Sequence, residues 1–210
     1  DYQLGLWAAE QAKKYKNLTV LENTLIDKIN VDGEVSYNNI KERFDKVINV
    51  AGPWAYELMK NNSIDSNYEL DLVRGSHIVI DRELDHGYFL EAPNERRVFF
   101  VLPYQGQTLI GTTEVKQSGL GEINPSKFEI AYLTNAYNYY FINKITEHDI
   151  VYSFSGVRPL VKNSKEMSLT TREYVIQKNG NVISVFGGKW TTSRKLAKKV
   201  AKKVEYTKYN

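Results

Sequence analysis

The middle of the chain consists of short, mostly apolar segments with turns between them, whereas both ends include segments with the longer spacing of helices. Between residues 70 and 113, short segments rich in β-branched and aromatic residues are separated by turn-forming residues, which is typical of an antiparallel sheet. Residues 125–143 place apolar side chains three and four positions apart, which predicts one packed helix. The strands predicted in this section are residues 70–74, 77–81, 88–91, 98–104 and 108–113.

The two ends of the chain have the pattern of strands that alternate with helices. A buried strand predicted at residues 44–50 stops at Ala51, Gly52 and Pro53, and proline is favoured in the first turn of a helix. Asn179-Gly180 is a typical hairpin turn. The remaining predicted elements of the two ends are a helix near the N-terminus, strands at 18–21 and 181–186, and helices at 54–60 and 193–204, while strands at 150–155 and 169–177 complete the middle section.

This order of elements predicts a two-lobe structure of the α+β or α/β class. Residues 61–177 are expected to form one lobe around a mixed or antiparallel sheet, while residues 1–60 and 178–210 together form an α/β lobe. Ligands of open α/β sheets bind beyond the carboxyl ends of the strands. The turns that follow the strands of the α/β lobe are therefore candidate binding sites.

Composition excludes several kinds of chemistry. The chain has no cysteine, which removes disulfides, thiolate metal sites and cysteine nucleophiles, and with only three histidines no metal site is predicted. A net charge of +3 argues against nucleic acid as a partner. The lysine-rich helix at 193–204 fits a solvated amphipathic surface better than the alternative, a contact with an anionic membrane or nucleic acid.

The strongest local signal is a glycine pair between the last strand and the last helix. Glycines let a ligand approach the backbone, and a helix N-terminus favours negative charge, so this turn is a candidate anion site. It is not a P-loop, because that motif needs Ser or Thr directly after the lysine. The alternative, an ordinary turn capped by a threonine hydroxyl, stays open at this point. The residues of the turn are Gly187, Gly188, Lys189, Trp190, Thr191 and Thr192.

Three further residues are candidates for binding or catalysis. Arg158 follows Gly156 and precedes Pro159, where a fixed guanidinium suits a carboxylate, phosphate or developing oxyanion, although the local pattern by itself favours a structural salt bridge in a loop. His77 stands at the start of a strand and is either a general base or hydrogen-bond donor or a structural histidine. Arg172 is either an anion clamp or a solvated charge.

Six stretches of the chain, taken in order, resemble the FAD-dependent glycerol-3-phosphate dehydrogenases. The histidine at position 77 is more typical of the aerobic dehydrogenase and oxidase branch, because the anaerobic branch tends to carry an aliphatic residue there. The matching stretches are VINVAGPW (47–54), RGSHIVI (74–80), LIGTTEV (109–115), YSFSGVRPLV (152–161), TTREY (170–174) and SVFGGKWTT (184–192).

The resemblance implies a two-lobe flavoprotein of the FAD-dependent oxidoreductase type, of which the chain is an internal fragment. Residues 1–60 and 178–210 would belong to the FAD-binding lobe, and 61–177 would be the substrate-binding lobe. The family's N-terminal G-x-G-x-x-G fingerprint and its C-terminal domain have no counterpart in the 210 residues. We therefore expect the isolated chain to bind no FAD and to have no dehydrogenase activity.

The resemblance also implies a reaction and a role for each candidate residue. Glycerol 3-phosphate would lose a hydride from C2 to FAD and become dihydroxyacetone phosphate. His77 would be the proton acceptor or would orient it, Arg158 would stabilise the developing alkoxide, and Arg172 and Lys189 would bind the phosphate, with all four on one surface. The flavin would lie against Ala51, Gly52 and Pro53 and against Gly187, Gly188, Lys189, Trp190, Thr191 and Thr192.

Quinone or oxygen would accept the electrons, so the expected location is the cytoplasm or the inner face of the membrane as a peripheral protein. Expected partners are the missing N- and C-terminal parts of the same protein and a second copy in a homodimer. Two alternatives remain open. One is a flavin-dependent amine or 2-hydroxy-acid oxidase, and the other is a non-catalytic module that binds a phosphosugar.

Overall fold

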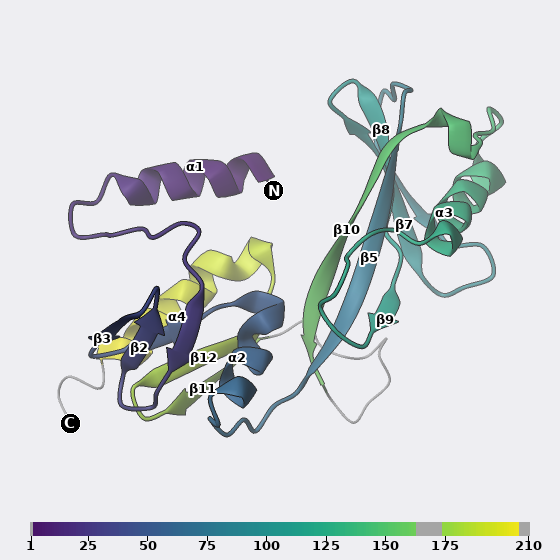
Figure 1. Ribbon diagram of the computed structural model, residues 1–210. Coiled ribbons are helices and arrows are strands. Elements are labelled where there is room, and N and C mark those ends of the chain that lie inside the picture. Colours follow the sequence, from purple (N-terminus) through teal and green to yellow (C-terminus); the bar gives the residue numbers. More distant parts are fainter. Residues whose placement is uncertain (1, 163–173, 206–210) are drawn as a thin grey trace. The chain divides into compact units, whose positions relative to one another are not determined.

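A computed structural model describes residues 2–162 and 174–205 of the chain (Figure 1). Its contacts divide the chain into two compact units: unit 1 is Asp1–Glu69 with Val161–Asn210, and unit 2 is Leu70–Leu160. Unit 2 is thus shorter than the middle lobe predicted at 61–177. The reason is that a strand at Tyr174–Asn179 pairs within unit 1.

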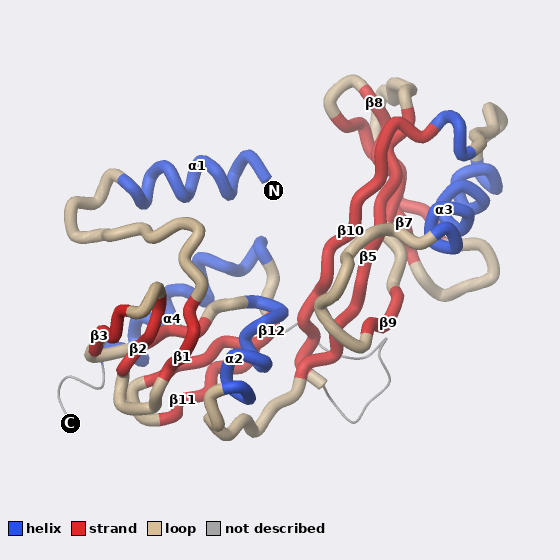
Figure 2. Tube along the Cα trace, viewed as in Figure 1, coloured by secondary structure: helices blue, strands red, loops and turns tan. Residues whose placement is uncertain are grey.

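Unit 2 is built on one six-stranded sheet with a helix on one face (Figure 2). The strands follow the order β10-β5-β8-β7-β6, and β9 pairs with β5 beside this path. The predicted antiparallel section is confirmed, with β6 and β7 at the predicted bounds. The elements are β5 Leu70–Ile80, β6 Tyr88–Glu91, β7 Val98–Tyr104, β8 Gln107–Gly111, β9 Val115–Gln117, α3 Lys127–Tyr140, a 3-10 turn at Glu147–Asp149 and β10 Ile150–Val161.

Alternation along the strands gives the sheet two faces, one of which packs on α3. Ile78 on β5 and Ile110 on β8 are fully buried and pack with the apolar side of α3, including Leu133 and Tyr137. His77 is the neighbour of Ile78 and therefore belongs to the opposite face. The predicted strands 70–74 and 77–81 are one strand, β5, because the chain stays extended through the glycine and serine between them.

Unit 1 combines two small sheets with helices. In the order β11-β12-β4, β11 and β12 form an antiparallel hairpin and β12 runs parallel to β4. The hairpin turn at Asn179-Gly180 is confirmed, since Asn179 pairs with Val182. The elements are α1 Tyr2–Lys13, β1 Ile26–Ile29, β2 Glu34–Tyr37, β3 Ile40–Arg43, β4 Val47–Asn49, a 3-10 turn at Gly52–Trp54, α2 Ala55–Asn61, β11 Tyr174–Asn179, β12 Val182–Gly187, a 3-10 turn at Trp190–Thr192 and α4 Ser193–Glu205.

The N-terminal part of unit 1 differs from the prediction. The strand predicted at 18–21 is wrong, because these residues are exposed and form no regular element. The first sheet is instead the antiparallel meander β1-β2-β3, which the pattern did not reveal because β3 is exposed along its whole length. The strand predicted at 44–50 is confirmed only over Val47–Asn49.

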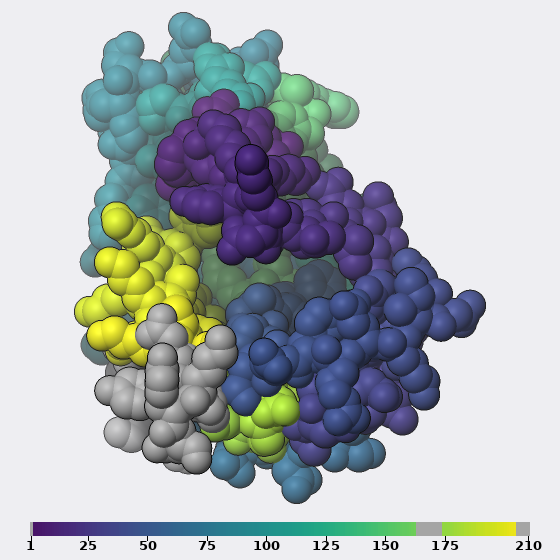
Figure 3. Space-filling view, turned by 90° about the vertical axis from the view of Figure 1, so that its left-hand side faces the viewer, coloured from purple at the N-terminus to yellow at the C-terminus, as the bar shows by residue number. Residues whose placement is uncertain are grey.

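The two terminal helices of unit 1 lie at its surface (Figure 3). α1 has no buried residue. On α4, Leu196 and Val200 pack on Ile183 and Val185 of β12, while the lysines of the helix are exposed. The amphipathic interpretation of α4 therefore accounts for its apolar and its charged residues.

Candidate functional site

His77 lies on the face of the unit 2 sheet opposite α3, between two close neighbours. Its ring stacks on Phe154 of β10 with centroids 5.0 Å apart and planes 10° apart. On β8, Gly111 is its cross-strand partner, and a Cβ atom at Gly111 would lie only 2.2 Å from His77 Cδ2. The imidazole therefore lies directly over a position where only glycine leaves room.

Arg158 comes from β10, and its guanidinium reaches across to β5. Arg158 Nη2 donates to Thr112 Oγ1 at 3.0 Å. A Cβ atom at Gly75 would lie 2.3 Å from Arg158 Nη1, so the guanidinium fills the space that this glycine leaves. Gly75 and His77 are on the same face of β5 because strand residues alternate. The structure thus brings His77 and Arg158 together on one face.

The surroundings of His77 keep its imidazole neutral. Burial, and then the charge of Arg158, lower the pKa of His77 from 6.5 to about 4. Its Nδ1 atom is buried and has no hydrogen-bond partner among the residues that the structure describes. A neutral imidazole can accept a proton, and a guanidinium beside it can stabilise a negative oxygen.

A buried glutamate on the other face of the sheet was missed by the sequence reasoning. Glu129 is 3% exposed and lies in the first turn of α3, where it forms a capping box with Ser126. Its carboxylate oxygens accept hydrogen bonds from Arg74 Nη2 (2.7 Å), Ser76 Oγ (2.6 Å), Thr113 Oγ1 (2.7 Å), and Ser126 N (2.9 Å) and Oγ (2.8 Å).

Glu129 is ionised despite its burial. Burial raises the pKa of Glu129, but the hydrogen bonds from Ser76, Ser126 and Thr113 together outweigh it and lower the pKa from 4.5 to about 2. Two signals in the sequence could have found this group. The spacing Ser126-x-x-Glu129 is a capping box, and Arg74 begins the stretch that ends beyond His77.

The candidate turns of unit 1 follow two neighbouring parallel strands. β4 ends at Asn49 and β12 ends at Gly187, and because these strands run parallel, the turns after them leave the same edge of the sheet. Buried Asn49 shapes the first turn: its Oδ1 accepts from Ala51 N at 3.3 Å and its Nδ2 donates to Ala55 O at 2.9 Å.

The second turn has a different local structure from a capped helix start. Gly187 and Gly188 adopt φ values of 72° and 103°, a region that favours glycine. No side chain caps the 3-10 turn at Trp190–Thr192, and Thr192 Oγ1 instead donates to Lys189 O at 3.3 Å. The 3-10 turn therefore has no threonine hydroxyl cap. Lys189 itself is exposed.

The predicted site residues thus fall into three sets. His77 and Arg158 lie together in unit 2. Lys189 and the turns at 51–53 and 187–192 belong to unit 1. Arg172 lies outside the described residues. That these residues form one site stays a prediction.

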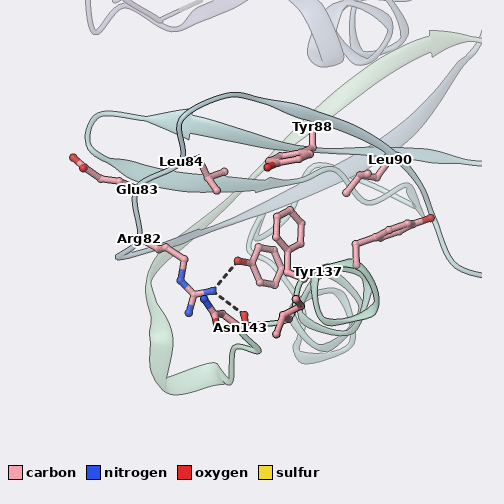
Figure 4. A pocket seen from close by; sticks show the side chains of 10 residues that line it. Arg82, Glu83, Leu84, Tyr88, Leu90, Tyr137 and Asn143 are labelled. Atoms are coloured by element: carbon pink, nitrogen blue, oxygen red, sulfur yellow. Dashed lines mark hydrogen bonds between the residues drawn. The ribbon is translucent and has the colours of Figure 1, made fainter.

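A pocket of about 530 Å³ in unit 2 contains none of the predicted site residues (Figure 4). Arg82 at one end donates from Nη1 to Tyr137 Oη and to Asn143 O, each at 2.8 Å. Tyr88 and Leu90 lie on the other side of the hollow from Tyr137. Arg82 follows β5, and its hydrogen bonds link this end of the strand to α3 and to the chain after α3. Its role is therefore structural.

Two features of other protein classes are not found in the described residues 2–162 and 174–205. These residues contain no group of three or more His, Asp or Glu side chains that could hold a metal ion. None of the helices formed by these residues has the length and apolar character needed to cross a membrane.

The chain matches the family model DAO, described as FAD dependent oxidoreductase, over residues 1–202. It belongs to this family. The predicted fold class is thereby confirmed, and so is the resemblance to glycerol-3-phosphate dehydrogenases. The glycerol-3-phosphate dehydrogenase of Pseudomonas aeruginosa is 39% identical over 162 residues, which are 72% of this chain and 31% of that protein.

A second relative is named for a different substrate. The D-erythritol 1-phosphate dehydrogenase of Brucella abortus is 38% identical over 162 residues, 73% of this chain and 32% of that protein. The chain therefore spans about a third of the length of these relatives.

Solved structures of similar fold include other proteins that act on glycerol phosphates by their names. The glycerol-3-phosphate dehydrogenase of Bacillus halodurans, complexed with FAD, has a TM-score of 0.77 at 26% identity and covers 89% of this chain and 39% of its own. The L-alpha-glycerophosphate oxidase of Mycoplasma pneumoniae, with FAD bound, has a TM-score of 0.59 at 21% identity over 87% of this chain and 48% of its own, which shows a shared fold.

Proposed function

We propose that the chain is the substrate-handling part of an FAD-dependent dehydrogenase that oxidises glycerol 3-phosphate at C2 to dihydroxyacetone phosphate. The observation that carries this proposal is the pair of His77 and Arg158 on one face of the unit 2 sheet. The similarity to glycerol-3-phosphate dehydrogenases supports the choice of substrate.

His77 and Arg158 divide the chemistry at the C2 hydroxyl group. Arg158 stabilises the negative charge that develops on the oxygen, and neutral His77 accepts the proton that leaves it. An anionic substrate beside the imidazole favours its protonated form and so raises the pKa of His77 from its low resting value. The imidazole is then a stronger base in the complex than in the free protein.

The turns of unit 1 are our candidates for holding the flavin. Both leave the same sheet edge, and a Cβ atom built at Gly52 would meet no atom within 4 Å, so a planar ring can approach the backbone there. When bound, FAD supplies the hydride acceptor. Gly187–Thr192 would present backbone N–H groups, with Ala51, Gly52 and Pro53 on the neighbouring strand end. The 210 residues hold no dinucleotide fingerprint, so we expect the isolated chain to retain no FAD.

Lys189 and Arg172 are our candidates for the phosphate group. A doubly charged phosphate is bound best by more than one cation. D-erythritol 1-phosphate is a second candidate substrate, because the Brucella relative bears that name at an identity close to that of the Pseudomonas relative. Both compounds are phosphorylated polyols. For the electron acceptor we propose quinone or oxygen, and for the location the cytoplasm or the inner face of a membrane.

The experiment is anaerobic reduction of the bound flavin in the full-length product of the gene that encodes the chain. Glycerol 3-phosphate and D-erythritol 1-phosphate are compared with glycerol, glycine and lactate. Loss of the oxidised flavin absorbance with a phosphorylated polyol, and not with glycerol, is the expected result. Reduction by glycine or lactate alone would contradict the proposal and favour an amine or 2-hydroxy-acid oxidase. Addition of oxygen or a soluble quinone to the reduced protein then identifies the acceptor.

A further inference from the structure

The buried carboxylate of Glu129 connects the three strand segments that carry the candidate site. It accepts hydrogen bonds from Ser76 on β5 and from Thr113, which follows β8. Ser76 Oγ also lies 2.7 Å from Ser155 Oγ on β10, so the network reaches the third segment. The backbone of β5 also contacts Thr113 directly, since Ser76 N donates to Thr113 Oγ1 at 2.9 Å.

Each residue of this network is the chain neighbour of a residue at the site. Ser76 stands between Gly75 and His77, Thr113 follows Thr112, which accepts a hydrogen bond from Arg158, and Ser155 follows Phe154, on which His77 stacks. Because neighbouring residues of a strand point to opposite faces, holding Ser76 and Ser155 fixes the directions of His77 and Phe154. The network therefore lies on the reverse face of the sheet, behind the site.

Capping of α3 alone does not explain these contacts. Ser126 and Glu129 form the capping box at the N-terminus of α3. Arg74 Nη2 lies 2.7 Å from Glu129 Oε2 and balances the charge of the carboxylate. The hydroxyl groups of Ser76, Thr113 and Ser155 add nothing to the cap. A buried ion pair is also a weak source of stability compared with well-packed apolar residues, whereas such groups can specify one arrangement of the chain.

We propose that Glu129 is a positioning residue for His77 and Arg158, acting through Ser76, Thr113 and Ser155. Its effect on turnover rests on the proposed function, but its effect on the placement of His77 does not. The two are therefore measured separately.

The first measurement is the pKa of His77 by NMR titration of the imidazole in the 210-residue chain, which has three histidines. In Glu129→Gln, an amide NH₂ replaces one acceptor oxygen, and the strands around His77 lose their common partner. Water then reaches the imidazole, and the pKa of His77 rises from about 4 towards 6.5. A direct loss of negative charge would have the opposite sign and lower it.

Two control variants separate positioning from charge and from stability. Glu122→Gln removes an exposed carboxylate from the same unit. Tyr137→Phe removes the buried hydroxyl that accepts from Arg82, on the same helix but outside the network. Both are expected to leave the His77 titration unchanged. An unchanged pKa in folded Glu129→Gln, or an equal shift in Tyr137→Phe, would overturn the proposal.

If the Glu129→Gln variant does not fold, Ser155→Ala is the variant that tests the proposal. It removes only the last link, so Glu129 keeps its other partners. A smaller rise of the His77 pKa is expected, with a changed ring-current shift from Phe154. If both stay as in the parent chain, Glu129 has a structural role only.

The second measurement is steady-state kinetics of the full-length gene product. Glu129→Gln should lower kcat/KM for glycerol 3-phosphate by about 10²-fold at unchanged flavin content, since a small misplacement of reacting groups costs about that much. If the parent protein does not oxidise glycerol 3-phosphate, the proposed function fails while the titration still decides the positioning role. A kcat/KM unchanged by Glu129→Gln in an active enzyme would overturn the inference alone.

Discussion

The candidate groups of unit 2 are held by side chains, whereas those of unit 1 are presented by the backbone. The ring of His77 stacks on Phe154 and lies against Gly111, and Arg158 donates a hydrogen bond to Thr112. In unit 1, the second turn offers a glycine pair with positive φ, an exposed Lys189 and no side-chain cap.

This difference matches what each part is proposed to do. A group that transfers a proton or stabilises a developing charge must keep one position, because reorganisation during the reaction would cost rate. A turn that faces a flat ring or an anion needs space and free N–H groups. Substitutions in unit 2 should therefore act mainly on kcat, and those in unit 1 mainly on binding.

The largest effect is expected from Arg158→Ala in the full-length gene product. Loss of one charge-stabilising donor lowers kcat/KM for glycerol 3-phosphate by about 10²–10³-fold, which is about 3 kcal/mol. Steady-state kinetics check this. Arg96→Ala, which removes an exposed arginine from the same unit, is the matched control and should have no effect. A loss below tenfold for Arg158→Ala would make this arginine structural.

Gly75→Ala tests the fit between β5 and Arg158. The new Cβ atom would lie 2.3 Å from Arg158 Nη1 and 2.6 Å from Thr112 Oγ1, so both the guanidinium and its hydrogen-bond partner have to move. We expect kcat/KM to fall by about 10²-fold, with only a small change in the free energy of unfolding. Gly119→Ala meets no atom within 4 Å and serves as control. Equal kinetics in the two variants would contradict the proposed role of Arg158.

The pH dependence of stability tests the burial of His77. Its pKa is lowered from 6.5 to about 4, so in this range the unfolded chain binds a proton that the folded chain does not. The free energy of unfolding should thus fall as the pH falls below 6.5, by about 2 kcal/mol at most before carboxyl groups begin to titrate. Denaturant unfolding across the window measures this. In His77→Gln the slope should flatten, and a parent slope retained by that variant would show that His77 is not the titrating group.

Lys189→Ala should have the smallest effect. Loss of one exposed cation from the proposed phosphate site raises KM for glycerol 3-phosphate about tenfold and leaves kcat unchanged, since a hydrogen bond to a charged group contributes about 1.5 kcal/mol or more. Lys195→Ala, an exposed lysine of α4, is the control. A fall in kcat without a change in KM would place Lys189 in the chemistry and remove the contrast between the two units.

The sequence predicted the elements whose pattern depends on burial. The strands β6 and β7 are recognisable as runs of β-branched, aromatic and aliphatic residues, and α3 by the helical spacing of its apolar residues, because each packs apolar side chains into the unit 2 core. The meander β1-β2-β3 could not be predicted in the same way, since β3 is exposed throughout and has no apolar face. Residues 18–21 look like a strand in composition, but no partner strand pairs with them in the described structure.

The sequence by itself determined the family, the two-part organisation of the elements and the candidates His77 and Arg158. Only the tertiary structure decided what surrounds these side chains. The glycines under His77 and Arg158 lie on neighbouring strands of the same sheet, and Glu129 comes from a helix on the reverse face. Periodicity along a chain reports which face of an element is buried, but not which distant residues its register brings into contact.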